Sequence, residues 1–267
     1  MKAGFSFDLL SEDRIKAALN NDSFVDKIYA FWSVSSTNDF AYKRALHGDA
    51  EGTLVVAEEQ TRGRGRKARV WDSQFNMGLW FSLVLMPDIP TSKAGLLPFL
   101  ASVSIAEALE NLLGLKPDLK WPNDALISGK KFCGILSDVE FTNGRVKFII
   151  LGVGLNVNHK IDDFPEDIRG QATSLRIESG TRVDRADLLA EFLKRFERNY
   201  KEFSLKGIND ILDKWKARCS RFGRQVQVVQ DDQQFEGVFQ DFDAEGCMIL
   251  RLKSGETKKI VAGDILF

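Results

Sequence analysis

Apolar and polar positions along this chain follow the two periods that characterise strands and helices. Alternating or continuously apolar runs, bounded by residues that favour turns, predict strands. These runs are residues 27–34, 53–57, 77–86, 119–127, 130–136, 138–142 and 145–152. Apolar residues spaced three and four apart predict helices. The helices are expected over residues 11–20, 39–46, 94–113, 184–203 and 208–218.

The pattern changes at about Ser220. From there, short β-type runs are separated by turn signals at intervals of roughly ten residues. The runs cover residues 225–229, 235–239, 248–252 and 259–261. Regularly spaced short strands predict a small antiparallel barrel. Two domains are therefore expected, at residues 1–219 and 220–267.

Composition is that of an ordinary soluble globular protein, and the formal net charge is −1. A nearly balanced chain has no overall attraction for nucleic acid or for an anionic membrane. The cysteines are scattered, and His47 and His159 lack metal-ligand spacing, so a zinc site is not expected. The N-terminal region has no long apolar run, which predicts neither a secretory signal nor a membrane span and favours a cytoplasmic location.

The segment of residues 60–71 departs from this balance. Five of the eight residues from Arg62 to Arg69 are cationic, and Gly63 and Gly65 alternate with the arginines. Such a segment cannot enter a core, because each buried cation would need a partner. Glycines allow close backbone approach, and N–H groups together with guanidinium groups suit phosphate oxygens. A solvated loop and a nucleic-acid patch are the alternatives, but the balanced net charge favours a small anionic ligand.

Three further polar clusters are unusual in their context. Ser35–Asn38 is a run of hydroxyl and amide side chains before a predicted helix, and capping that helix needs only one of them. Lys120, Asn123 and Asp124 are set among apolar residues around a proline that restricts the backbone. Lys131 begins an apolar strand, so its ammonium group can be drawn into a cleft.

Glycines within predicted strands add to this pattern. Gly134 lies inside one strand, which indicates close approach of a ligand or of another backbone segment. In residues 152–158, two glycines and two asparagines at alternating positions leave one face nearly bare and lined with amides. A glycine-weakened edge strand is the alternative, and a ligand lying against that face explains the pattern better.

In this order, the motifs resemble those of the biotin–protein ligases over about residues 28–267. Any one of them is weak, but the ordered set is highly specific. The motifs are Ser36-Thr37-Asn38, Gln60, Arg62–Arg69 with Trp71, Lys120–Asp124, Lys130-Lys131 with Gly134–Leu136, and Gly152–Asn156. The family implies an α/β (α+β) mixed-sheet catalytic domain joined to a small SH3-like barrel. Family members that are also repressors carry an N-terminal winged helix, and this chain is expected to be of the ligase-only type without DNA binding.

The resemblance implies a reaction in two steps. Biotin and ATP, with Mg²⁺ present, form biotinyl-5′-AMP and pyrophosphate, and a lysine of a biotin carboxyl carrier protein then takes the biotin and releases AMP. Two anions react in the first step, so cations and preorganised N–H donors lower the barrier without a protein nucleophile. The sequence does not identify metal ligands, and it leaves a homodimer possible.

The family implies roles for residues at the matching positions. Ser36, Thr37 and Gln60 are expected to hold the ureido end of biotin. Arg64, Gly65 and Arg66 are expected to bind the biotin carboxylate and the adenylate phosphate as the loop closes. Catalysis is assigned to Lys131, Arg66 and Asp124. The remaining residues expected at the ligands are Asn38, Gly63, Trp71, Lys120, Asn123, Gly134, Gly152, Gly154 and Asn156.

One departure from the family pattern is Ala68, where many members have a third loop glycine. It bears on how fast the loop opens more than on the chemistry. Two other functions compete with the first. A lipoate–protein ligase shares the fold and an adenylated carboxylate, and a non-catalytic biotin-sensing or nucleic-acid-binding protein would use the basic segment as a salt-dependent patch.

Overall fold

The structure, a computed structural model, describes residues 8–19, 23–231 and 233–266. The first sheet comprises β1 (Lys27–Phe31), β2 (Thr53–Ala57), β3 (Gly78–Leu85), β4 (Asp118–Lys120), β5 (Asp124–Ile127), β6 (Lys130–Thr142) and β7 (Arg145–Asn156). The second comprises β8 (Gln225–Gln230), β9 (Gln233–Phe242), β10 (Met248–Leu252), β11 (Thr257–Ile260) and β12 (Asp264–Ile265). The helices are α1 (Glu12–Ala18), α2 (Thr37–Leu46), α3 (Leu97–Leu113), α4 (Leu175–Ser179), α5 (Arg185–Lys206) and α6 (Asn209–Lys216). Short 3₁₀ turns are η1 (Arg66–Ala68), η2 (Thr91–Leu96) and η3 (Ile161–Asp163).

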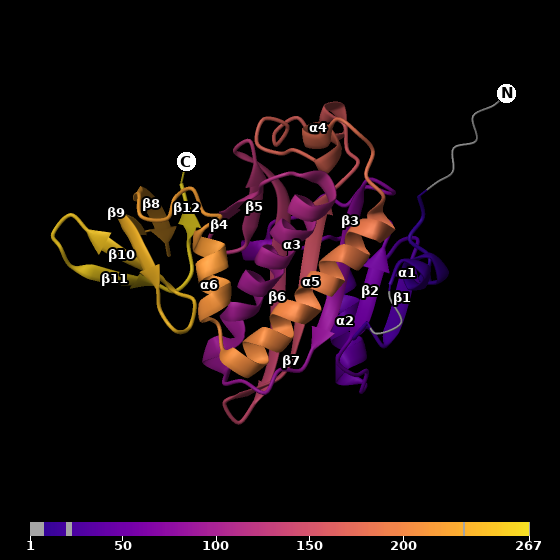
Figure 1. The fold of residues 1–267 in the computed structure, drawn as a ribbon, viewed down its shortest axis with the longest axis horizontal. Coiled ribbons are helices and arrows are strands. Elements are labelled where there is room, and N and C mark those ends of the chain that lie inside the picture. The colour runs from indigo at the N-terminus through magenta and orange to yellow at the C-terminus, as the bar shows by residue number, and fades with distance from the viewer. Residues whose placement is uncertain (1–7, 20–22, 232, 267) are drawn as a thin grey trace.

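The two sheets have different topologies. The first is mixed and seven-stranded, with the order β1-β2-β3-β7-β6-β5-β4, in which β1 and β2 run parallel and the other neighbours antiparallel. The second is five-stranded and antiparallel, with the order β11-β10-β9-β8-β12. Figure 1 shows it beside the α6 end of the first sheet. A mixed α/β sheet followed by a separate antiparallel sheet confirms the predicted fold class.

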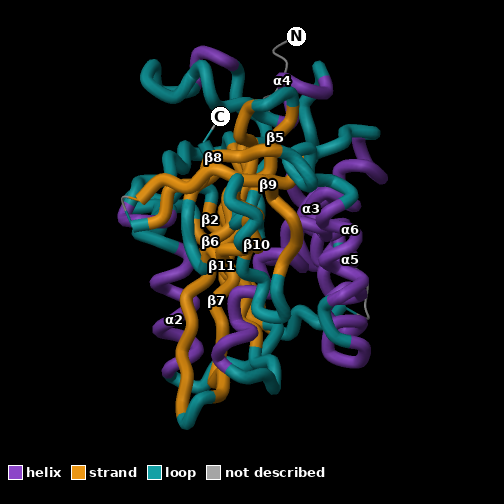
Figure 2. The backbone as a smooth tube through the Cα atoms, turned by 90° about the vertical axis from the view of Figure 1, so that its left-hand side faces the viewer, coloured by secondary structure: helices purple, strands orange, loops and turns teal. Residues whose placement is uncertain are grey.

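The mixed sheet is covered on both faces, which explains its continuously apolar strands. Leu54 and Val56 of β2 belong to the larger core with α3 and α5, whereas Val55 belongs to a smaller core with Ala41 and Ala45 of α2. Figure 2 shows α2 on one side of the strands and α3, α5 and α6 on the other. Helix α5 begins with an N-cap at Asp184, whose carboxylate accepts from the N–H of residues 186 and 187.

The structure differs from the predicted boundaries in several places. The strands predicted separately over residues 130–136 and 138–142 form one continuous strand, β6. The strand expected over 119–127 is two strands, β4 and β5, because the chain reverses at Trp121–Asn123, where Pro122 cannot donate to a ladder. Helix α4 and strand β12 were not predicted, since elements this short show no periodic pattern. Helix α1 ends at Ala18, and Asn20, the last residue of the predicted helix, lies outside the described residues.

The helical segment Thr91–Leu113 is long and apolar enough to cross a membrane by length and composition alone. In this fold 67% of its most apolar 18-residue stretch is buried, and its side chains form much of the larger core. Side chains that pack against a sheet are no longer available to lipid, so the segment has the burial of a core helix.

Candidate active site

A cleft of about 600 Å³ lies at the end of the mixed sheet where the polar motifs meet. It collects side chains and backbone from α2, the segment of residues 60–71, β5, β6, β7 and the C-terminal sheet. The predicted site residues that line it are Ser36, Thr37, Asn38, Gln60, Arg64, Gly65, Arg66, Trp71, Lys120, Asn123, Asp124, Lys131, Gly134, Gly152, Gly154 and Asn156. Gly63 does not line the cleft. A Cβ there would lie 2.3 Å from the carbonyl oxygen of Trp71, so its role in the structure is to let the loop fold on itself.

Ser36 and Thr37, the hydroxyl residues at the start of α2, make different contacts. The Ser36 hydroxyl caps the helix by accepting from the N–H of Asp39 (3.4 Å). Thr37 donates its N–H and its hydroxyl to Oε1 of Gln60, at 2.9 and 3.0 Å. The Gln60 amide in turn donates to the Ser73 hydroxyl at 2.9 Å. This chain of hydrogen bonds fixes which end of the Gln60 amide faces Thr37, so the cleft wall presents preset donors and acceptors.

Asn38 is held by the sheet. Its amide nitrogen donates to Asp138 Oδ2 at 2.9 Å, and its amide oxygen lies 2.6 Å from the Ser82 hydroxyl. A Cβ on Gly152 would lie 2.0 Å from that same amide oxygen. Asn38 therefore occupies the space that a side chain at position 152 would need. Its hydrogen bonds to Asp138 and Ser82 fix its own orientation in the cleft wall.

The basic segment forms an irregular hairpin with its tip over the cleft. Backbone N–H to C=O pairs join its two arms, and the tip turns through Lys67 and Ala68, both at positive φ (55° and 57°). Ala68 thus adopts a left-handed conformation that glycine takes more readily than alanine. The pairs, from base to tip, are Asn76 to Glu58 (3.2 Å), Gln60 to Ser73 (3.2 Å), Trp71 to Gly63 (2.9 Å) and Gly65 to Arg69 (2.7 Å).

The two arginines assigned to the ligands have different partners. The Arg64 guanidinium pairs with Asp39 at 2.9 Å and with Asp138 in a closer contact. The Arg64 guanidinium group therefore points towards α2 and β6, and its ion pairs attach the hairpin to these two elements. Arg66 donates to Asn123 Oδ1 at 3.1 Å and lies near the C-terminal sheet, so it spans the mouth of the cleft.

The C-terminal sheet reaches this hairpin through Asp264, which the sequence did not indicate. Its carboxylate lies 3.0 Å from Lys67, 3.1 Å from Arg69 and 3.5 Å from Arg66. Burial acts to raise the pKa of Asp264, but the three cations outweigh it and lower that pKa. The carboxylate therefore stays ionised and holds the hairpin tip against the second sheet.

Lys131 and Asp124 form an ion pair inside the cleft, 2.6 Å apart, across the β5–β6 pair. The Lys131 ammonium also lies 5.1 Å from the ring centre of Trp71. Lys120 is 9% exposed, and burial lowers the pKa of its ammonium group although Asp124 opposes the shift. Two lysines with a single carboxylate between them leave net positive charge at the centre of the site.

The glycine-rich face of β6 and β7 is covered by an indole ring. A Cβ on Gly134 would lie 2.8 Å from the ring of Trp71, and one on Gly154 would lie 2.6 Å from its Nε1 atom. The sequence predicted a ligand or another backbone segment at this face, and in this structure the neighbour is instead the side chain of Trp71. Its Nε1–H is buried without a hydrogen-bond partner among the described residues, which leaves one donor free for a ligand.

Sequence reasoning missed the segment that follows β7. His159, Phe164 and Ile168 line the cleft, and the His159 ring stacks on Phe164 with centroids 4.9 Å apart. Burial lowers the pKa of His159 to about 4, so the ring is neutral near pH 7. Asn156 holds the segment by donating to the Thr173 carbonyl at 3.1 Å. The one signal that could have found this segment is the presence of apolar residues such as Phe164 and Ile168 among its mostly polar neighbours.

Taken together, the cleft combines preset hydrogen-bonding groups at one end, cations at its centre and an apolar ring-lined wall. Such a site binds small anionic molecules that also carry an uncharged polar part. The fold and the cleft define a protein that can bind small anionic ligands of this kind.

Comparison with known proteins agrees with this class. A model of the Biotin/lipoate A/B protein ligase family matches residues 30–156, and a model of the Biotin protein ligase C terminal domain matches residues 222–267. The bifunctional ligase/repressor BirA of Bacillus spizizenii is 39% identical over 96% of this chain and 78% of its own length. The biotin--[acetyl-CoA-carboxylase] ligase of Mycobacterium tuberculosis is 30% identical over 97% of this chain and 99% of its own.

A solved structure is similar over most of the chain. The biotin protein ligase from Aquifex aeolicus in complex with biotin and ATP is 30% identical, with a TM-score of 0.77 over 90% of this chain and 98% of that one. This chain belongs to the biotin protein ligase family.

Proposed function

We propose that this chain activates biotin with ATP and transfers it to a lysine of a biotin carboxyl carrier protein. The observation that best supports this is the cleft itself, where Arg66, Lys120 and Lys131 converge beside a glycine face and a set of fixed amide and hydroxyl groups. The ureido group of biotin presents N–H donors and a carbonyl acceptor, which match Thr37 and Gln60 in chemical type.

In the first step a carboxylate oxygen of biotin attacks the α-phosphorus of ATP. The P–O bond to the leaving pyrophosphate breaks, and biotinyl-5′-AMP remains. Both reactants are anions, so cations that are already in place reduce the repulsion and stabilise the charge that develops on the phosphoryl oxygens. Lys131 and Arg66 are the residues we assign to this role, because both line the cleft and both are only partly exposed.

Mg²⁺ is the cofactor that we propose for this step. Asn123 and Asp124 offer oxygen ligands, the type this ion prefers, and they lie beside the cations expected at the phosphates. The ion usually binds through one or two carboxylates together with substrate phosphates, which this donor set permits. When bound, it would supply further neutralisation of phosphate charge.

In the second step the acceptor lysine amine attacks the carbonyl carbon of the mixed anhydride, and AMP leaves. The amine must lose its proton to become a nucleophile. Asp124 is the carboxylate closest to Lys131 within the cleft, and we propose it as the group that receives the proton. Closure of the hairpin before this step would protect the anhydride from water.

The test of this function is direct. Incubation of the protein with biotin, ATP and Mg²⁺ should yield biotinyl-5′-AMP by mass and release pyrophosphate. Competition between labelled biotin and lipoate separates this function from that of a lipoate ligase. Preference for lipoate, or salt-dependent nucleic-acid binding without pyrophosphate release, would support the alternatives.

Replacing Lys131 tests its assignment. Lys131→Ala should lower the rate of adenylate formation by about a hundredfold or more, the effect of losing one preorganised donor to a transition state. The fold should persist, since the ammonium group is partly exposed. The control is Lys147→Ala, an exposed lysine on β7 that lies outside the cleft. Parental rates in Lys131→Ala would show that another group stabilises the reaction.

Three further properties are proposals of the same kind. We propose a cytoplasmic location, because Cys133, Cys219 and Cys247 are buried free thiols, and cell fractionation tests it. We propose that the chain acts as a ligase without binding DNA, and a gel-shift assay at low salt tests this. A homodimer is consistent with the sequence, and sedimentation with and without biotin and ATP tests it.

A further inference from the structure

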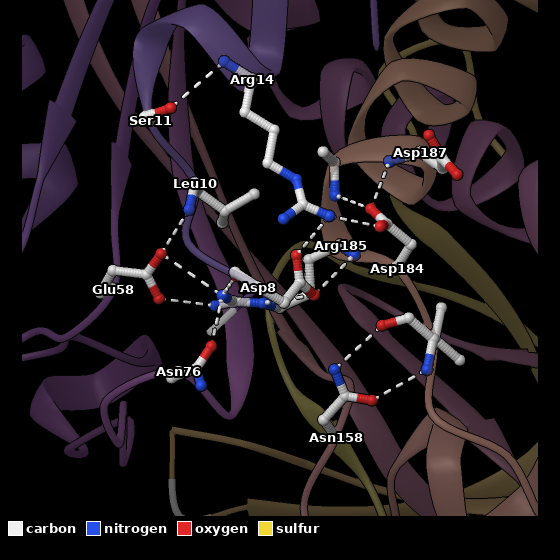
Figure 3. Close-up of polar contacts among 12 residues, drawn as sticks. Asp8, Leu10, Ser11, Arg14, Glu58, Asn76, Asn158, Asp184, Arg185 and Asp187 are labelled. Carbon is white, nitrogen blue, oxygen red and sulfur yellow. Dashed lines mark hydrogen bonds and ion pairs between the residues drawn. The ribbon is translucent and has the colours of Figure 1, made fainter. Parts of the chain in front are cut away.

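Arg185, the first residue of α5, is a buried cation that the reaction described above does not use. Its side chain is fully buried (0% exposed), and Figure 3 shows its guanidinium group surrounded by oxygen atoms. Nη1 donates to Glu58 at 2.8 Å and to the Gly78 carbonyl at 3.0 Å. Nη2 donates to Asn76 Oδ1 at 2.6 Å and to the backbone carbonyl of Asp8. Nε faces the Asp8 carboxylate at 3.4 Å.

Two of these partners are the ends of the basic hairpin. Glu58 comes directly after β2, and Asn76 comes just before β3, so residues 59–75 lie between them. The N–H of Asn76 donates to the carbonyl of Glu58 at 3.2 Å and closes the base of the hairpin. Arg185 binds the side chains of both residues and so sets the separation and direction of the two arms.

The N-terminal segment completes the network. Glu58 Oε1 accepts from the N–H of Leu10 at 2.5 Å, and Asp8 also pairs with Arg14 of α1 at 2.8 Å. Asp8 is 8% exposed and Leu10 is 3% exposed. A segment at the start of the chain is thereby bonded to the same carboxylate that begins the hairpin.

The physical cost of such a network indicates its use. A buried ion pair is often no more stabilising than apolar residues of the same volume, because both charges must leave water. What an arginine with directed donors adds is geometry, since each N–H fixes the position of one acceptor. Here the positions fixed are the two arms of the hairpin that carries Arg66 and Trp71.

We propose that Arg185 is a positioning residue for the ligase reaction. It holds the base of the hairpin through Glu58 and Asn76, and the segment Asp8–Leu10 completes this hold from the N-terminal side. Tilt of the arms at the base moves the tip, which closes over the activated intermediate. Weakening the network should therefore speed the escape of biotinyl-adenylate more than it slows its formation. This inference rests on the proposed function.

Asn76→Gly is the sharpest test. Asn76 has φ of 60°, a conformation that glycine adopts readily, and the change removes a single hydrogen bond from Arg185 while the ion pairs remain. The rate of adenylate release, measured by a chase with unlabelled biotin, should rise about tenfold, which corresponds to about 1.4 kcal/mol. The rate of adenylate formation at saturating substrates should change less than about twofold.

The matched control is Asn199→Ala. Asn199 is also fully buried, and its amide donates to the Ser104 hydroxyl at 2.9 Å between α5 and α3, away from the hairpin. It should lower the melting temperature without changing adenylate release. An equal rise in release for Asn199→Ala would show that general destabilisation is the cause and would overturn the proposal.

Two further variants test the contributions of Arg185 and of the N-terminal segment separately. Arg185→Lys keeps the buried charge but lacks the guanidinium fork, and Asp8→Ala removes the N-terminal partner. Both should raise the release rate. If Arg185→Lys does not fold, Asn76→Gly still decides the case. Parental release in Asn76→Gly overturns the role of Arg185, and parental release in Asp8→Ala overturns the part of the N-terminal segment. Failure of the parental chain to form adenylate would instead refute the proposed function.

Discussion

At the scale of single residues, the site depends on side chains that are missing as much as on those present. Gly134 and Gly154 leave a flat strip of backbone, and the Trp71 indole lies on it. The ring brings into the cleft an N–H donor that has no hydrogen-bond partner among the described residues, and it lies beside Lys131. A residue with a Cβ at either glycine would displace the ring, because packed interiors have little spare space.

Gly154→Ala should therefore impair ligand binding. Its new Cβ would lie 2.6 Å from Trp71 Nε1, well inside contact distance, so the indole must move. We expect biotin to bind about tenfold more weakly or worse, in line with the cost of overpacking a core. Isothermal titration measures this. Gly95→Ala is the control, since a Cβ there meets nothing nearer than 3.6 Å, and equal affinity in both variants would contradict the role given to the strip.

His159 makes stability depend on pH. Its folded-state pKa is lowered from 6.5 to about 4, so the unfolded chain binds the proton first as the pH falls. The contribution of His159 to the free energy of unfolding is therefore fully present above about pH 6.5 and decreases as the pH falls towards 4. Between pH 7 and pH 5 the free energy of unfolding should fall by about 2 kcal/mol. Denaturant unfolding at these two pH values should show a smaller difference in His159→Phe, which keeps the stack on Phe164. An unchanged difference would assign the slope to other groups.

At the scale of elements, the hairpin of residues 59–75 is held in place at its arms, its base and its tip. Its arms are paired by backbone hydrogen bonds, its base is held by Arg185, and its tip is held by ion pairs. Arg64 anchors one arm to Asp39 and Asp138. A cation-rich loop can stay ordered in this way because its cations have carboxylate partners, and several partly exposed ion pairs act together although each is weak by itself.

Arg66→Ala should loosen the tip. Arg66 contacts Asn123 and the carbonyl of Gly263 across the mouth of the cleft. Its loss removes these contacts, which we expect to retain the adenylate in the cleft. We expect the adenylate to leak and to biotinylate bystander proteins, as seen on a streptavidin blot. The exposed Arg251 of β10 provides a charge-matched control as Arg251→Ala. Biotinylation restricted to the carrier protein in both variants would contradict this role.

At the scale of the whole molecule, the two sheets share the active site. The Trp121 indole donates to the Gly246 carbonyl at 3.3 Å, and Asp264 reaches three cations of the hairpin. The second sheet therefore contributes a carboxylate at the hairpin tip.

Asp264→Asn tests this coupling. The variant removes the negative charge opposite Lys67, Arg69 and Arg66, and partly exposed ion pairs of this kind contribute about 0.2–1 kcal/mol each. Adenylate release should rise by a few-fold, and the difference from the parental chain should shrink at high salt. The control is Glu256→Gln, which changes an exposed carboxylate in the turn between β10 and β11. A salt-independent difference would point to a cause other than charge.

The sequence by itself determined the elements of this protein and the residue types of its site. Periodic burial is a local property, so β2 and β10 appear at the predicted residues. The resemblance to biotin–protein ligases also rests on local motifs, and sixteen of the seventeen predicted site residues line one cleft, with Gly63 the exception.

Only the tertiary structure decided which partners these residues have. Arg64 pairs with Asp138, the Trp71 ring covers Gly154, and Arg185 binds Glu58, although these residues are far apart along the chain. Asp264 meets the hairpin from a short strand that shows no periodic signal. A sequence pattern reports whether a side chain is buried or polar. Which distant group it meets is decided when the sheets and helices pack, because that packing alone sets distances between separated segments.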